Sequence, residues 1–255
     1  MNSASTYLDA ARNALSRIKV DQICRPTNAV ARSLETGGIV HVFGTGHSSL
    51  LAQEVFYRAG GIVAINPILD PRLGFEKGVI ESTEFERSID AARELAGASH
   101  FRYGDIGLVI SNSGRNALVI EMALQMKAAG LKVIALTNLE QSRTTSSRHP
   151  SGSRLFEVAD FVLDNHCPPG DAAVTIPGIP HAMGPVSTIV GAAILHAMFL
   201  QAAEQMAARG KPPRTFVSAN VGEGSTRSLQ ELVAPYEERI LYYRPGAKQH
   251  RRKKP

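Results

Sequence analysis

Two segments of the chain repeat one order of elements, and this repeat constrains the fold more than any other feature. Each segment begins with an apolar stretch, turns through small polar residues into a helical pattern, and returns through Ala-Gly to a second apolar stretch; the two cover residues 39–66 and 107–137. Alternation of this kind is typical of parallel strands joined by crossover helices. The sequence therefore predicts an α/β fold rather than an all-α bundle or an all-β sandwich.

The same alternation extends over most of the chain and predicts a doubly wound parallel sheet with helices on both faces. The five expected strands cover residues 37–44, 62–66, 104–111, 132–138 and 161–165. We expect residues 1–36 to form N-terminal helices, broken near Pro26, that pack on a main domain of residues 37–241. Residues 242–255 form a basic tail that we expect to be disordered.

The basic net charge comes from that tail. The chain carries 28 Lys and Arg against 23 Asp and Glu, a net charge of +5. Five of the basic residues lie within the last eight positions, KQHRRKKP, so the rest of the chain is formally neutral. A short basic run is usually a solvated chain end, and a nucleic-acid partner is not expected.

The cysteines and the apolar stretches indicate a cytoplasmic protein. Cys24 and Cys167 are far apart and belong to no paired metal-ligand spacing, so neither a disulfide framework nor a metal site is expected. The N-terminus lacks the apolar core of a signal peptide. The most apolar stretch, residues 184–203, contains a His and a Gln and fits a buried helix better than a membrane span.

A glycine-rich turn, GTGHSS, follows the first expected strand. A dinucleotide-binding turn needs a third glycine and an acid at the end of the next strand. Here Ser49 replaces that glycine and Asn66 ends the next strand. Both differences disfavour a nicotinamide cofactor, and no cofactor is expected.

A phosphoryl group fits the same turn better. Gly44 and Gly46 allow a tight bend with exposed N–H groups, and Ser48 stands where a helix begins. The turn SNSGRN repeats this chemistry with Ser111 and Ser113 at the start of another helix. Either turn alone could be an ordinary helix cap. Two such turns at the carboxyl ends of parallel strands favour one shared phosphate site.

The motifs GTGHS, SNSG, ALTN and GPVSTIVGAAILHAM, in this order over residues 37–210, resemble the sugar isomerase (SIS) domain family. Within it, NPILD, SNSGRNA and SRHPSG resemble a small single-domain branch labelled phosphoheptose isomerases. The resemblance implies a five-stranded sheet in flavodoxin-like order, a phosphorylated sugar as ligand, and a homodimer or homotetramer.

The resemblance also transfers a set of ligand-binding positions to this chain. The expected phosphosugar-binding residues are Gly44, Thr45, Gly46, Ser48, Ser111, Asn112, Ser113, Arg115, Asn116 and Thr137. Asn116 departs from the family pattern, which has a threonine there. An asparagine amide still donates hydrogen bonds.

The catalytic positions depart further. Aldose–ketose isomerisation through an enediol needs a base that moves a proton between C1 and C2 and an acid–base pair that opens the ring. Related arabinose-5-phosphate isomerases have a lysine where this chain has His47 and a glutamate where it has Leu118. The residues expected to act here are His47, Glu81 and His181. Glu81 is one of several acids in or directly after the irregular stretch 67–85, the others being Glu76, Glu84 and Glu86.

Three functions stay open on the sequence. The first is a metal-independent sugar-phosphate isomerase. The second is a phosphosugar sensor without catalysis; about 36 residues before the first strand are too few for a DNA-binding module, so its partner would be a protein. The third is an amino-sugar phosphate lyase or etherase, which Arg58 disfavours because such enzymes keep a glutamate at that position.

Overall fold

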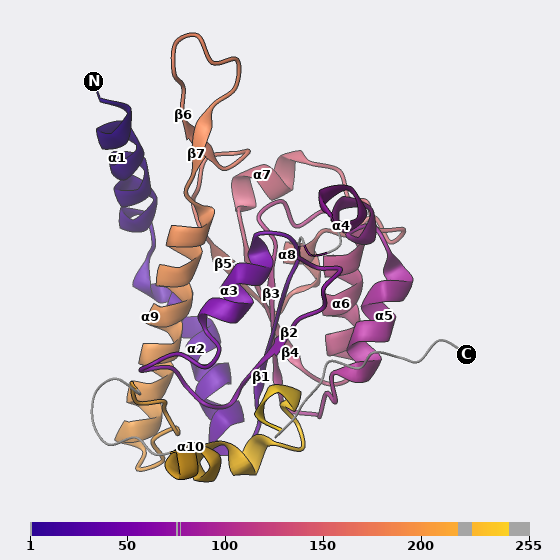
Figure 1. Ribbon diagram of the computed structural model, residues 1–255, viewed down its shortest axis with the longest axis vertical. Helices are drawn as coiled ribbons and strands as arrows, with labels where there is room; N and C mark the ends of the chain where they lie inside the picture. The colour runs from indigo at the N-terminus through magenta and orange to yellow at the C-terminus, as the bar shows by residue number, and fades with distance from the viewer. Residues whose placement is uncertain (1, 75, 77, 219–225, 245–255) are drawn as a thin grey trace.

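The computed structural model describes residues 2–74, 76, 78–218 and 226–244. At its centre lies a parallel sheet of five strands in the order β2-β1-β3-β4-β5 (Figure 1). The strands are β1 (Val40–Gly44), β2 (Ile65–Ile68), β3 (Ile106–Ile110), β4 (Lys132–Thr137) and β5 (Phe161–Asp164). The doubly wound α/β fold and the flavodoxin-like strand order are thereby confirmed.

Helices cover both faces of the sheet (Figure 1). On one face lie α2 (Val20–Glu35), α3 (Ser48–Glu54) and α9 (Ser187–Ala208); on the other lie α5 (Ile89–Ala98), α6 (Ala117–Ala128) and α8 (Leu155–Val158). Successive residues of β3 point to opposite faces of the sheet. Leu108 packs in the core beneath α2, α3 and α9, called the first core, and Val109 packs in the core beneath α5, α6 and α8, called the second core. Burial on both faces explains why the strands are apolar runs without polar alternation.

The two N-terminal helices, α1 (Ser3–Ser16) and α2, are separated at residues 17–19. The expected break near Pro26 is wrong, because Pro26 is buried inside a continuous α2. Proline removes one backbone hydrogen bond, but the packing of Ile23 and Val30 in the first core holds the helix together across it.

Several short elements lie where the sequence predicted loops. The irregular stretch contains α4 (Val79–Phe85), and the polar segment after β4, residues 139–154, begins with α7 (Leu139–Thr144). An antiparallel hairpin of β6 (Ala172–Val174) and β7 (Met183–Pro185) precedes α9 and projects from the top of the body (Figure 1). Elements this short show too few periods of their pattern to be read from sequence.

The end of the described chain closes the amino end of the sheet. After α9 the chain forms α10 (Thr226–Val233) and two short 3₁₀ turns, Ala234–Tyr236 and Leu241–Tyr243. The Tyr243 hydroxyl donates to the Val63 carbonyl at 2.7 Å. Of the expected tail, only residues 242–244 fall within the described part; residues 245–255 lie outside it.

A buried polar cluster joins this segment to the sheet. The Asp105 carboxylate accepts hydrogen bonds from the Arg239 guanidinium, the His41 ring (3.2 Å) and the Ile39 N–H (3.0 Å). Asn66 donates to the second ring nitrogen of His41 at 3.0 Å, so the ring is neutral, with its proton facing Asp105. Burial lowers the pKa of His41. These polar groups lie opposite the strand ends that carry the two glycine turns.

The helix α9 is long and apolar enough to cross a membrane by length and composition, with a mean hydropathy of 1.2 over 18 residues. The core helix of a soluble protein has the same composition. In the fold, α9 packs against α2 and α3 and contributes Val190, Ile194 and Met198 to the first core.

Candidate functional site

The two glycine turns lie next to each other at the carboxyl end of the sheet. The first follows β1 and leads into α3; the second follows β3 and leads into α6. β1 and β3 are neighbours, and from them the chain winds outward in opposite directions. Doubly wound sheets bind their ligands at this switch point.

The first turn requires its glycines. A Cβ on Gly44 would lie 2.5 Å from the carbonyl oxygen of Ser48. Gly46 has a φ of +53°, and its N–H donates to the Leu73 carbonyl at 2.7 Å. The Ser49 hydroxyl closes the turn by donating to the Gly46 carbonyl at 2.7 Å. The bend places Ser48, half-buried, at the first position of α3.

The second turn is held from inside and from behind. The Ser111 hydroxyl oxygen accepts a hydrogen bond from the Gly114 N–H at 3.1 Å. The Asn112 carbonyl accepts from the buried Thr137 hydroxyl at 3.1 Å. Thr137 and Ser111 therefore shape the turn, while the half-buried Asn112 and Ser113 occupy its outer part.

A narrow pocket of about 30 Å³ opens between the turns. Among the expected ligand-binding and catalytic residues, His47 and Ser48 of the first turn and Asn112 of the second line it. Thr45 is buried. The structure thus brings both turns to one pocket, which is the arrangement that the phosphate hypothesis requires.

Three further pocket residues escaped the sequence analysis as ligand candidates. Asn165 directly follows β5 and donates to the Asn112 side-chain oxygen at 2.7 Å; Ser187 and Thr188 begin α9. The Asp171 carboxylate caps α9 by accepting from the N–H and the hydroxyl of Ser187 at 2.8 and 2.6 Å. Asn165 could have been predicted as a ligand-binding residue, because it is a polar residue at the carboxyl end of a parallel strand.

The side chain of Asn116, the departure from the family pattern, joins two charged residues at the start of α6. Its amide donates to the Glu86 carboxylate at 2.6 Å, and its oxygen accepts from the Arg148 guanidinium at 2.9 Å. The Glu86 main-chain carbonyl accepts from the Leu118 N–H at 3.2 Å. A Cβ on Gly46 would lie 3.4 Å from a Glu86 carboxylate oxygen. Glu86 therefore touches both turns.

The three expected catalytic residues lie in different places. His47 is the N-cap of α3 and lines the pocket. Glu81 is exposed in the first turn of α4. His181 is exposed in the segment between β6 and β7, on the projecting hairpin. Neither Glu81 nor His181 lines the pocket within the described part of the chain; the carboxylate that reaches the turns is Glu86.

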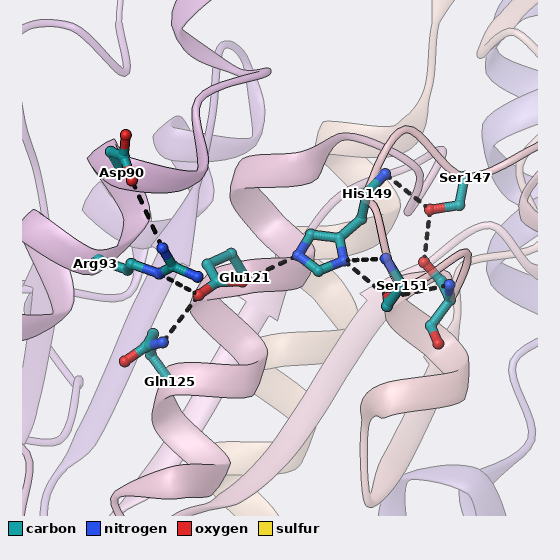
Figure 2. A network of polar contacts seen from close by, with 8 residues as sticks. Asp90, Arg93, Glu121, Gln125, Ser147, His149 and Ser151 are labelled. Atoms are coloured by element: carbon teal, nitrogen blue, oxygen red, sulfur yellow. Dashed lines mark hydrogen bonds and ion pairs between the residues drawn. The ribbon is translucent and has the colours of Figure 1, made fainter.

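A buried hydrogen-bonded pair joins α6 to the segment after α7 (Figure 2). His149 and Glu121, with side chains 7% and 6% exposed, are 3.0 Å apart, and Arg93 and Gln125 each donate to Glu121 at 2.9 Å. Burial raises the pKa of Glu121, but these hydrogen bonds outweigh it and lower the pKa. Glu121 is therefore ionised, and it holds the side chains of His149, Arg93 and Gln125 beside the second core.

Among the described residues, no group of three or more His, Cys, Asp or Glu side chains is placed to hold a metal ion. Cys24 and Cys167 are free thiols. Burial raises the pKa of Cys167 to about 12, so this thiol stays protonated and weakly reactive.

Comparison with known sequences identifies relatives over nearly the whole chain. A family model described as the SIS domain matches residues 6–138, just over half of the chain. A UPF0309 protein of Geobacillus kaustophilus is 41% identical over 220 residues, 86% of this chain and 87% of the relative. A UPF0309 protein of Listeria innocua is 39% identical over 239 residues, covering 92% and 96%.

Two solved structures share the fold at low identity. A phosphoheptose isomerase from Francisella tularensis aligns with a TM-score of 0.50 and 19% identity, over 79% of this chain and 94% of that one. A phosphoheptose isomerase from Neisseria gonorrhoeae aligns with a TM-score of 0.50 and 17% identity, over 79% and 96%.

Proposed function

Because the chain belongs to the SIS-domain family, we propose that it binds the phosphoryl group of a sugar phosphate in the pocket between its two glycine turns. One observation carries the proposal: Ser48 of the first turn and Asn112 of the second, which follow two neighbouring strands, line the same pocket at the switch point of the sheet. The start of α9 adds Ser187 and Thr188 on a third side.

The chemistry of the pocket suits an anion. A helix N-terminus carries the positive end of the helix dipole, and α3 and α9 begin at the pocket with Ser48 and Ser187. Serine and threonine hydroxyls and asparagine amides can donate to phosphoryl oxygens without adding a fixed charge. No metal ion enters this proposal.

We propose further that the bound sugar undergoes aldose–ketose isomerisation through an enediol. His47, whose imidazole is a side chain suited to proton transfer, lines the pocket, and the Glu86 carboxylate lies against both turns. In this scheme one of the two residues removes the proton from the carbon next to the carbonyl. The other transfers protons to and from the sugar oxygens. The two solved relatives named as phosphoheptose isomerases support this class of reaction.

A phosphosugar sensor without catalysis is the second candidate. It is favoured by the placement of Glu81 and His181, which leaves His47 as the sole pocket-lining member of the expected catalytic set within the described residues. The lyase or etherase hypothesis needs a glutamate at position 58. This chain has Arg58 there, paired with Glu54 at 2.8 Å.

We also propose that the protein works in the cytoplasm as a homodimer or homotetramer. The projecting hairpin supports self-association, because Ile179 and Met183 on it are 40% and 50% exposed. A second copy seated on the hairpin would cover these side chains and lie close to His181.

A thermal-shift screen tests the phosphate site. Pentose, hexose, heptose and amino-sugar phosphates are each added to the full chain, beside the same sugars without phosphate. A ligand at 100 times its Kd stabilises the folded state by about 2.7 kcal/mol. Ser113→Ala should remove the shift, and Ser16→Ala, on exposed α1, should keep it. Equal shifts with phosphorylated and unphosphorylated sugars would contradict the proposal.

Isomerisation is tested with the sugar phosphate that gives the largest shift. Turnover in D₂O should place solvent deuterium at C1 or C2 of the sugar. Binding without exchange, together with a captured protein partner, would favour the sensor.

A further inference from the structure

A loop far from the turns in sequence, residues 145–153, packs along the second turn. The Arg148 N–H donates to the Arg115 carbonyl at 2.8 Å, and the Leu155 N–H just beyond the loop donates to the Gly114 carbonyl at 2.8 Å. The Arg115 guanidinium donates to the Ser146 hydroxyl at 3.2 Å. The loop and the turn are therefore one connected unit.

The buried His149–Glu121 pair anchors this loop to α6 (Figure 2). The second ring nitrogen of His149 accepts from the Ser151 N–H at 3.1 Å, so the ring presents its other N–H to Glu121. Inside the loop, the Ser147 hydroxyl donates to the Ser153 carbonyl at 2.7 Å. A loop tied at its centre to a buried carboxylate holds the residue next to His149 in a defined place.

That neighbouring residue is Arg148, whose side chain is exposed and reaches the start of α6. Its guanidinium donates to the Asn116 oxygen at 2.9 Å. Arg115, one of the phosphosugar-binding residues that the family resemblance implies, instead turns its guanidinium toward Ser146 in the loop. Arg148 is therefore the arginine whose guanidinium bonds to the side chain of the second turn that also holds Glu86.

A cation beside Asn116 would balance negative charge at the second turn. A sugar phosphate bound at the second turn would lie near the Glu86 carboxylate, which is hydrogen-bonded to Asn116. Two anions so close repel unless a cation lies between them. A guanidinium can bond to phosphoryl oxygens through two parallel N–H groups and stays charged at every working pH.

We propose that Arg148 binds the phosphoryl group of the ligand, exchanging Asn116 for a phosphoryl oxygen, and that the Glu121–His149 pair positions it. The inference rests on the proposed phosphate site and adds to it a cation supplied by the 145–153 loop. Arg148 selects phosphorylated sugars over neutral ones; Glu121 and His149 act only through the loop.

Isothermal titration with inorganic phosphate and with the best sugar phosphate from the screen tests the assignment. Arg148→Gln should weaken both affinities by roughly 10-fold or more, the loss expected for a charge-assisted hydrogen bond. The salt dependence of the Kd should also become shallower, since one cationic contact is gone. Arg143→Gln, an exposed arginine of α7, is the matched control and should change neither.

A double-mutant cycle tests the positioning pair. His149→Gln should weaken binding on its own, but in the Arg148→Gln background it should add little, because the residue it positions is already gone. Two losses that simply add would mean that His149 acts through general stability, and would overturn its positioning role.

The outcomes separate the two proposals. Wild-type affinity in Arg148→Gln, with binding lost in Ser113→Ala, overturns the role of Arg148 and leaves the phosphate site intact. A wild-type chain that binds no phosphate or sugar phosphate overturns both.

Discussion

The side-chain amide of Asn116 donates a 2.6 Å hydrogen bond to the carboxylate of Glu86, and through this contact the end of α4 is joined to the start of α6. Asn116 replaces the threonine of the family pattern. A threonine hydroxyl is too short to hold Glu86 and Arg148 at once, whereas the amide bonds to both. The substitution therefore has a clear structural use in this chain.

Glu86 should be needed for proton transfer and not for binding. Glu86→Gln keeps the shape and the hydrogen bond to Asn116 in altered form, so the thermal shift with a sugar phosphate should persist. Deuterium exchange at C1 or C2 should fall by about 100-fold or more, the usual contribution of a general base. Glu81→Gln on exposed α4 is the control. If Glu81→Gln lost deuterium exchange while Glu86→Gln kept it, the base would be Glu81 and not Glu86.

Two glycine substitutions should change stability in opposite directions. Gly44→Ala places a Cβ 2.5 Å from the Ser48 carbonyl oxygen and should lower the free energy of unfolding by about 1–3 kcal/mol. Gly97→Ala lies within α5, where a Cβ meets nothing within 4 Å, and should raise it by up to about 1 kcal/mol. Urea unfolding measures both. A neutral Gly44→Ala would contradict the close approach described for the first turn.

The buried cluster at the amino end should make stability fall in mild acid. Burial lowers the pKa of His41, so below about pH 6.5 the unfolded chain takes up a proton that the folded chain refuses. The free energy of unfolding should therefore decrease between pH 7.5 and 5.5. Asp105, Arg239 and His100 are the charged or titratable groups around this ring.

Replacement of the ring isolates this effect. His41→Gln lowers stability overall but should flatten the pH dependence, while exposed His181→Gln should leave the slope as it is. An unchanged slope in His41→Gln would show that other groups govern the acid response.

The projecting hairpin should govern self-association. Ile179→Glu and Met183→Glu place charges on exposed apolar positions of the hairpin and should shift the protein toward monomer in light-scattering measurements. Tyr103→Lys, at a 91% exposed position before β3, is the control. Assemblies that resist both hairpin substitutions would place the contact elsewhere.

The core of the fold was predictable because it rests on long, repeated patterns. Five apolar runs with helical stretches between them specify parallel strands, and glycine turns mark where these strands end. The hairpin and the helices α4 and α7 escaped prediction because each contains only three to seven residues. The continuity of α2 through Pro26 escaped it because tertiary packing, which no local rule contains, outweighs one lost hydrogen bond.

The residues of the candidate site were likewise predictable only where they directly follow a strand. Ser48 and Asn112 could be predicted because each lies one turn beyond a strand that the pattern reveals. Choosing Glu86 among the acids of the irregular stretch required the path of that stretch over the first turn. Arg148 required the pairing of Glu121 with His149, residues 28 positions apart that no short motif connects.

The polar cluster at the amino end also has a consequence for biosynthesis. Arg239 meets Asp105 across 134 residues and Tyr243 meets Val63 across 180. On a ribosome, the first strands emerge long before either partner leaves the exit tunnel. Until residues 239–243 leave the tunnel the nascent sheet lacks both contacts, so its amino end is completed only after all five strands have emerged.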